Sequence, residues 1–385
     1  MAMTRRERLM ATLTGRPVDR PAVSFYEIGG LVMDPTDPDP FNIYRDPSWQ
    51  PLLELAETRT DLIRMRSAVR THSHEAWGAD ETASSEFFET EHYVEEGRRI
   101  TRTTLKMASK AMTSVTRRDR DVDTVWTVQH LLKTNDDVRT YLEVPDEAFA
   151  ETIDVTPLVE EEQRLAERGI VMVDTEDPLC AAATLFSMED FTIFAMTENA
   201  LCHRLLEKCA RRIQRRTEEV AQQFPGRLWR IYGPEFATEP YLPPHLFEEY
   251  VVRYAGPMVR AIKSKGGFAR VHIHGRIRNV LDAVVEMEAD AIDPIEPPPQ
   301  GDVDLAFVRQ RYGQNLVLFG NLEMADIENA EPKQFEQLVR QALADGTRGS
   351  GRGFVLMPSA CPYGRTINKR TVQNYETMVR CVEDF

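Results

Sequence analysis

Residues 244–275, PHLFEEYVVRYAGPMVRAIKSKGGFARVHIHG, contain one complete helix-to-strand unit. Apolar residues recur at helical spacing over 244–265, and Gly266-Gly267 predicts the end of that helix. The next residues, FARVHIH at 268–274, predict a strand. A helix that leads into such a strand is the repeating unit of α/β folds.

The same alternation extends outward over the whole chain. Several of the other apolar runs are nearly continuous, as expected for parallel strands that are buried on both faces. They predict seven more strands, at 21–26, 61–66, 170–175, 228–232, 290–294, 315–320 and 353–357, with helices over 186–224, 276–289 and 333–344. Eight strands that alternate with helices predict one α/β domain over 1–385, a (β/α)₈ TIM barrel.

One region interrupts the alternation. Residues 83–128 are typical of irregular or antiparallel structure, as in RRITRTTLKMA at 98–108. We expect an inserted hairpin subdomain between the second and third barrel strands. The insertion has too few apolar residues for a core of its own, so it should cap or flank the barrel mouth.

Composition limits the classes of function. The chain has 385 residues, 42% of them hydrophobic and 28% charged, which is typical of a globular protein. Its net charge of -15 argues against nucleic acid or an anionic membrane as a partner. The odd number of cysteines, five, does not resemble a disulfide framework, and MAMTRRERLM at the start lacks the apolar core of a secretory signal. We therefore expect a cytoplasmic protein that binds no membrane.

Reactive side chains gather at the predicted carboxyl ends of the strands, where TIM barrels place their active sites. His272 and His274 are two residues apart on one strand, so their side chains point to the same side. Cys361 follows the last strand and would add a thiolate. Two imidazoles and one thiolate suit Zn²⁺, with Glu235 as a further ligand or base.

Other interpretations of these residues stay open. His272 could be an interior histidine bonded to a carbonyl, and Cys361 could be a small buried hydrophobe. His72 and His74 share the spacing, but their polar surroundings predict a solvated loop, and His203 is expected to pack in a helix or lie at the surface. The candidates for shaping the pocket or orienting substrate are Tyr26, Glu27, Asp174, Tyr232 and Asp293. No phosphate-binding loop, dinucleotide fingerprint or nucleophile elbow is found.

Four blocks resemble the uroporphyrinogen decarboxylase superfamily, in the expected order. They are TRRERLMATLTGRPVDRPAV at 4–23, HLFEEYVVRYAGPMVRAIKSKGGFARVHIHG at 245–275, ADAIDPIEPPPQGDVDLAFVRQRYGQNLVLFGNLE at 289–323 and GRGFVLMPSACPYG at 351–364. The resemblance implies a (β/α)₈ barrel. True uroporphyrinogen decarboxylases carry an arginine-bearing stretch after the first strand, whereas SFYEIGG at 24–30 has no arginine.

The chain is more similar to the zinc methyltransferases of that superfamily. These carry His-x-Cys after strand five and a Cys after strand eight, where this chain has His272, His274 and Cys361. The resemblance implies Zn²⁺ on these three residues, with Glu235 and Glu323 tuning the metal or moving a proton. It implies methyl transfer between a small donor or acceptor, such as a methoxylated compound or a thiol, and cobalamin. We expect the cobalamin on a separate corrinoid protein, because no Asp-x-His-x-x-Gly motif occurs here.

Two alternatives remain. One is a metal-independent, decarboxylase-like lyase that acts on a smaller carboxylate, for which the candidate cations are Arg64, Arg66, Arg276 and Arg365. The other is a non-catalytic barrel or ligand sensor. The sequence leaves the substrate, the direction of transfer and the oligomeric state open, a homodimer included.

Overall fold

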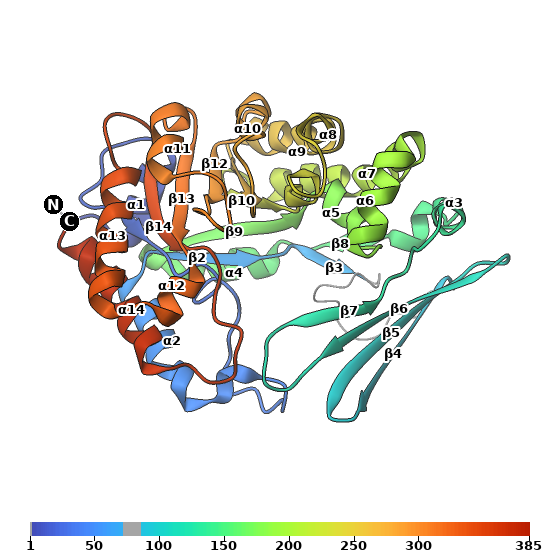
Figure 1. Cartoon of the computed structure of the whole chain (residues 1–385), viewed down its shortest axis with the longest axis horizontal. Helices are drawn as coiled ribbons and strands as arrows, with labels where there is room; N and C mark the ends of the chain where they lie inside the picture. The colour runs from blue at the N-terminus through green and yellow to red at the C-terminus, as the bar shows by residue number, and fades with distance from the viewer. Residues whose placement is uncertain (1, 72–85) are drawn as a thin grey trace.

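A curled sheet of eight parallel strands forms the centre of the computed structural model, which describes residues 2–71 and 86–385 (Figure 1). The strands are β1 (Ala22–Val23), β2 (Leu62–Arg66), β9 (Gly169–Glu176), β10 (Leu228–Tyr232), β11 (Phe268–Ile273), β12 (Ala291–Pro294), β13 (Val317–Leu322) and β14 (Phe354–Pro358). Their order is β1-β14-β13-β12-β11-β10-β9-β2, so barrel strands that follow one another in the chain lie side by side, and the last strand, β14, lies beside the first. All eight coincide with predicted strands.

The two edge strands of this sheet meet and close it into a (β/α)₈ barrel. The Asp61 amide, directly before β2, donates a hydrogen bond of 2.7 Å to the Val23 carbonyl of β1. A Met65 amide bond of 2.9 Å to Gly30 continues the contact beyond β1. The predicted TIM-barrel fold is confirmed.

Helices surround the barrel and connect its strands. They are α1 (Arg5–Leu13), α2 (Gln50–Arg59), α3 (Asn135–Leu142), α4 (Thr156–Leu165), α5 (Pro178–Ala183), α6 (Met188–Thr197), α7 (Asn199–Gln223), α8 (Pro244–Phe247), α9 (Arg253–Ser264), α10 (Leu281–Glu286), α11 (Leu305–Tyr312), α12 (Met324–Asn329), α13 (Pro332–Gly346) and α14 (Lys369–Glu383). Within 2–71 and 86–385, none combines the length and apolar character that a bilayer crossing requires.

Two helical predictions need refinement. The segment predicted at 244–265 is α8 and α9 joined by a π-helical turn at Glu248–Val252, ahead of Pro257, which has no amide hydrogen to donate. The helix predicted at 276–289 is shorter, because Arg276 forms a β-bridge with Glu239 and α10 begins only at Leu281.

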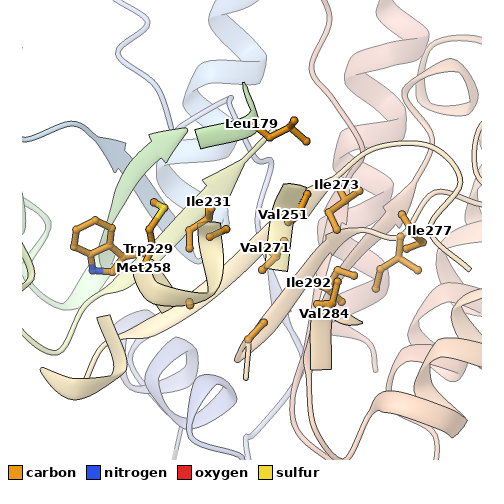
Figure 2. Close-up of a cluster of buried hydrophobic side chains, with 14 of the residues drawn as sticks. Leu179, Trp229, Ile231, Val251, Met258, Val271, Ile273, Ile277, Val284 and Ile292 are labelled. Atoms are coloured by element: carbon orange, nitrogen blue, oxygen red, sulfur yellow. The ribbon is translucent and has the colours of Figure 1, made fainter. Parts of the chain in front are cut away.

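Side chains alternate between two apolar layers along the barrel strands. Trp229 and Ile231 of β10 point outward, and so do Val271 and Ile273 of β11, which pack with Met258 of α9 (Figure 2). A second apolar cluster fills the inside, with members such as Leu228, Met172, Ala291, Phe319 and Met357. Because residues two apart share a side, this alternation sends Arg270 and His272 of β11 into the barrel.

The insertion between the second and third barrel strands is an antiparallel sheet in the order β4-β5-β6-β7. Its strands are β4 (Phe88–Glu95), β5 (Arg98–Lys106), β6 (Ala111–Arg118) and β7 (Val125–Gln129), and it projects to one side of the barrel (Figure 1). A short pair, β3 (Val69–Thr71) with β8 (Glu151–Ile153), lies beside it. The inserted subdomain is confirmed, and it holds four strands rather than one hairpin.

Backbone hydrogen bonds join the inserted sheet to the loop that follows β14. The Asp123 amide donates a bond of 2.8 Å to the Tyr363 carbonyl, and Val122 pairs with Gly364. At its other end, Phe88 and Leu105 belong to the main apolar core. These contacts agree with the expectation that the insertion flanks the mouth, while its behaviour as part of one domain stays a prediction.

Candidate active site

His272 lies inside the barrel with one ring nitrogen held in place. Its Nδ1 is 2.7 Å from Oδ2 of Asp293, the residue directly opposite on β12. Burial lowers the pKa of His272 to about 4, so the ring is neutral at physiological pH. Burial opposes ionisation of Asp293, but Arg270 and His272 hold its pKa below the usual range, so the carboxylate accepts a hydrogen bond from Nδ1–H of His272. Nε2 of His272 is therefore the unprotonated nitrogen, and its lone pair can accept a hydrogen bond or bind a metal.

His274, two residues further along the chain, also has its Nδ1 bonded to a carboxylate. Its Nδ1 is 2.8 Å from Oε1 of Glu296, whose second oxygen accepts a bond of 2.6 Å from the Gly275 amide. Burial opposes protonation of His274, but the hydrogen bond and charge of Glu296 outweigh it and raise the pKa. The side chain is 38% exposed, and its ring lies 4.6 Å from that of His272, at right angles. His274 therefore faces the open end of the barrel.

A carboxylate on Nδ1 is the usual outer support of a metal-binding histidine, because it fixes the tautomer and turns Nε2 toward the ligand. Both histidines have this support. Nε2 of His272 is 3.4 Å from the Tyr26 hydroxyl, which accepts a hydrogen bond from Arg230. Arg230 is in turn paired with Asp174 at 2.6 Å. Tyr26 and Asp174, both predicted at the site, thus lie in one buried network below the histidines.

Two carboxyl groups, those of Glu323 and Glu235, lie near His274. Each has one buried oxygen that receives no hydrogen bond from the described part of the chain. Oε2 of Glu323, after β13, accepts from Ser359 at 3.3 Å, while its Oε1 has no donor. Burial raises the pKa of Glu323 to about 7. Oε2 of Glu235, after β10, is unpartnered too, and burial again raises its pKa. Both groups interact electrostatically with His274, and their assignment as catalytic residues stays a prediction.

Cys361 lies at the same end of the barrel but faces another residue. Its thiol donates a hydrogen bond of 2.8 Å to Oε2 of Glu27, and the residue is 3% exposed. Burial and the adjacent Glu27 charge raise the pKa of this thiol well above its usual range. Over 2–71 and 86–385, no three His, Cys, Asp or Glu side chains converge as a metal site. The structure thus brings His272 and His274 together and leaves Cys361 on Glu27.

The donor set still fits a divalent cation in its chemistry. Nε2 of neutral His272 is a metal-binding group, and so is Nε2 of His274 once that ring loses its proton. The unpartnered oxygens of Glu235 and Glu323 lack the positive charge that a metal would supply. Cys361 joins this set only if its thiol turns away from Glu27. The assignment of Zn²⁺ to His272, His274 and Cys361 stays a prediction.

The remaining predicted residues have defined neighbours. Tyr232, at the end of β10, is partly exposed, and the Arg230 guanidinium lies 5.0 Å from its ring centre. Asp293 is fully buried between His272 and Arg270, so it orients His272 and does not face solvent. Glu27 holds the Cys361 thiol. Of these, Tyr232 and Glu27 are partly exposed, and their contact with substrate stays a prediction.

Sequence reasoning missed Arg230, Arg270 and Glu296. The two arginines interrupt apolar strands, LWRIY at 228–232 and FARVHIH at 268–274, at positions that share the side of His272. A charged residue at an inward position of such a strand is the signal that would have found them. Glu296 gave a weaker signal, as one carboxylate beyond a strand end.

The cations proposed for a lyase lie elsewhere. Arg64 and Arg66 pair with Glu161 at 3.3 and 3.1 Å, and Arg365 pairs with Asp121 at 3.0 Å. Arg276 is exposed. His203 packs in α7, with Nδ1 at 2.8 Å from the Tyr254 hydroxyl, as expected. His72 and His74 lie outside the described residues.

Comparison with known proteins adds a family and a fold. The family model described as uroporphyrinogen decarboxylase (URO-D) matches residues 122–385. No curated protein matches the chain. A solved methyltransferase from Methanosarcina mazei is similar at a TM-score of 0.61 and 13% identity, covering 100% of this chain and 99% of that one.

Two further solved structures are only distantly similar. A D-psicose 3-epimerase, solved in the presence of D-fructose, has a TM-score of 0.36 and 9% identity, over 64% of this chain and 85% of its own. A GH5-4 broad specificity endoglucanase from Bacteroides salanitronis has a TM-score of 0.31 and 10% identity, over 62% and 78%. At these TM-scores neither likeness carries an argument about this chain.

Proposed function

The chain belongs to the uroporphyrinogen decarboxylase family, whose model matches residues 122–385, and from this premise we propose that it is a zinc-dependent methyltransferase. It moves a methyl group between a small substrate and cobalamin on a separate corrinoid protein. The observation that carries the proposal is the pair of imidazoles, His272 and His274, each with Nδ1 bonded to a carboxylate, so that Nε2 is the nitrogen that a metal would take. The full-length likeness to a methyltransferase supports the same class of reaction.

The metal would be held by His272 and His274, with Cys361 as the third ligand once its thiol leaves Glu27. Zn²⁺ bound there supplies a Lewis acid for the atom that gains or loses the methyl group. Glu27 lies 2.8 Å from the thiol sulfur, so it is placed to take the thiol proton as Cys361 becomes a ligand. Asp293 and Glu296 keep both rings in the tautomer that presents Nε2.

Glu323 and Glu235 have a separate task in this proposal. A carboxyl group with a pKa of about 7 is half protonated at neutral pH, so Glu323 can give or take a proton during turnover. Glu235, partly exposed beside His274, can balance charge at the reacting atom. Neither group has a hydrogen-bond donor on its free oxygen among the described residues, which leaves both free for a ligand.

Most of the cations that the decarboxylase-like alternative needs are already in ion pairs. That reaction needs cations over a substrate carboxylate, yet Arg64, Arg66 and Arg365 are paired with Glu161 and Asp121. The two arginines inside the barrel, Arg230 and Arg270, are paired with Asp174 and Asp293.

The test is methyl transfer with free cobalamin in place of the corrinoid protein, followed by the change in the visible spectrum of the cobalt. Zinc-loaded protein is supplied with methylcob(III)alamin and a thiol, or with cob(I)alamin and a panel of methyl donors. We expect transfer that stops on chelation and returns with Zn²⁺. If no donor or acceptor gives zinc-dependent transfer, the proposal is wrong.

A further inference from the structure

Carboxyl groups form an acidic arc along one side of the barrel mouth. Four of the five consecutive strands from β9 to β13 end in one, and β11 ends in His274. The members of the acidic arc are Asp177, Glu235, Glu296 and Glu323. They interact electrostatically in that order: Asp177 with Glu235, Glu235 with His274, and His274 and Glu296 with Glu323.

Three members of the acidic arc keep a buried oxygen that no donor of the described residues reaches. These atoms are Oδ2 of Asp177, Oε2 of Glu235 and Oε1 of Glu323. Asp177 is fully buried and Glu323 is 8% exposed, so water does not replace the missing donors. An unpartnered buried carboxylate is costly unless a ligand compensates it. Three in one arc point to a ligand whose positive charge would hold Glu235 and Glu323 in their ionised form, against the burial that raises the pKa of both groups.

The cations of the protein near the arc are already engaged. Arg216 is paired with Glu176 at 2.5 Å, Arg230 with Asp174 at 2.6 Å and Arg270 with Asp293 at 3.0 Å. Within the arc, Nδ1 of His274 is hydrogen-bonded to Glu296. No basic side chain of the described chain donates a hydrogen bond to Glu235 or Glu323, so their charge is available to a molecule from outside.

The arc is open to solvent at its centre and has an aromatic ring nearby. His274 is 38% exposed and Glu235 is partly exposed. The ring of Tyr363, after β14, is 47% exposed, and its hydroxyl interacts electrostatically with Glu296. Aromatic faces attract alkylated ammonium groups, which carry a diffuse charge with little hydration.

We propose that the small substrate is a cation, and that its alkylated ammonium head binds in the acidic arc between Glu235 and Glu323. This inference rests on the proposed methyltransferase function and names its substrate class. A carboxylate or phosphate substrate would meet like charge here, whereas an alkylated ammonium head would place its positive charge between Glu235 and Glu323.

The experiment is titration calorimetry with choline as the charged probe and dimethylbutanol, its uncharged isostere, as the matched ligand. We expect choline to bind, and the isostere to bind roughly tenfold more weakly or less. Glu323→Gln and Glu235→Gln keep side-chain shape and should each weaken choline binding by about tenfold. Glu286→Gln, an exposed carboxylate at the end of α10, is the control and should leave binding unchanged.

Three results would overturn the inference. The first is that choline does not bind, and the second is that choline and its isostere bind equally well. The third is that zinc is lost in proportion to the choline bound, because the acidic arc would then itself be the metal site. Methyl transfer to a thiol, measured in parallel, separates the two proposals. If transfer occurs and choline neither binds nor inhibits, only the substrate class is wrong, and if choline binds while no transfer is found, only the reaction is wrong.

Discussion

The two ends of the barrel differ in whether their buried charged groups have hydrogen-bonding partners. At the end where the strands begin, Asp61 is fully buried and accepts from Arg8 at 2.5 Å, from Arg20 at 2.9 Å and from the Val23 amide at 2.9 Å. Arg8 also pairs with Asp19 at 2.7 Å. The four charged groups of this cluster, Asp61, Arg8, Arg20 and Asp19, all have a partner of opposite charge.

At the mouth, Asp177, Glu235 and Glu323 each keep a buried oxygen that no donor of the described residues satisfies. A network with all its partners stabilises the fold, while one that is left incomplete is kept for a ligand. In TIM barrels the end where the strands begin serves stability and the mouth serves chemistry. Substitutions at the two ends should therefore have different effects.

The largest expected effect is loss of stability at the Asp61 end. Asp61→Ala leaves the buried guanidinium of Arg8 without one of its two carboxylates, which should lower the free energy of unfolding by about 3 kcal/mol. Urea denaturation measures the loss. Methyl transfer by the protein that stays folded should be unchanged, and a loss below about 1 kcal/mol would remove the contrast between the two ends.

The next effect is a pH dependence at the mouth. Because the pKa of Glu323 rises from 4.5 in the unfolded chain to about 7 in the fold, the folded state binds the extra proton between these values. Its contribution to stability is therefore full below about pH 4 and is lost as the pH rises through 7. Glu323→Gln removes this titration.

Relative to the wild-type protein, Glu323→Gln should gain about 2–3 kcal/mol of unfolding free energy between about pH 5 and pH 8. Urea denaturation of both proteins across that range, without metal, measures the difference. If the difference in unfolding free energy did not change with pH, Glu323 would have the pKa of an ordinary surface carboxylate.

A smaller effect concerns the Cys361 thiol. Glu27→Gln removes the charge that, together with burial, raises the pKa of Cys361. In metal-free protein, Cys361 should then react faster with iodoacetamide at about pH 8, while unfolding free energy changes by about 1 kcal/mol or less. Peptide mapping by mass spectrometry reports the rate at this cysteine, and the buried Cys381 is the internal control. Equal rates in both proteins would mean that Glu27 does not set the state of Cys361.

The sequence predicted the barrel because its strands are buried on both faces. Runs such as GFVLM at 353–357 and IVMVDT at 170–175 have no polar alternation to confuse them with other elements. The inserted sheet was harder, since strands such as RRITRTTLK are half-exposed and rich in threonine and arginine. Its four-strand order depends on pairing across turns, which composition does not encode.

The candidate site divides in the same way. That His272 and His274 share a side follows from the two-residue period of a strand. The contact of Cys361 with Glu27 depends on where the loops after β14 and β1 meet, and no local pattern fixes that. Arg230 and Arg270 lay inside predicted strands, but their carboxylate partners belong to neighbouring strands.

The zinc content of purified His274→Ala tests the central claim most directly. We expect wild-type protein and the control His245→Ala, an exposed residue of α8, to bind one zinc ion per chain in elemental analysis. His274→Ala should lose most of that zinc because two protein ligands cannot close the site, while its thermal melt without metal matches the wild type. Full zinc occupancy in folded His274→Ala would contradict the account of the mouth as a metal site built on the two histidines.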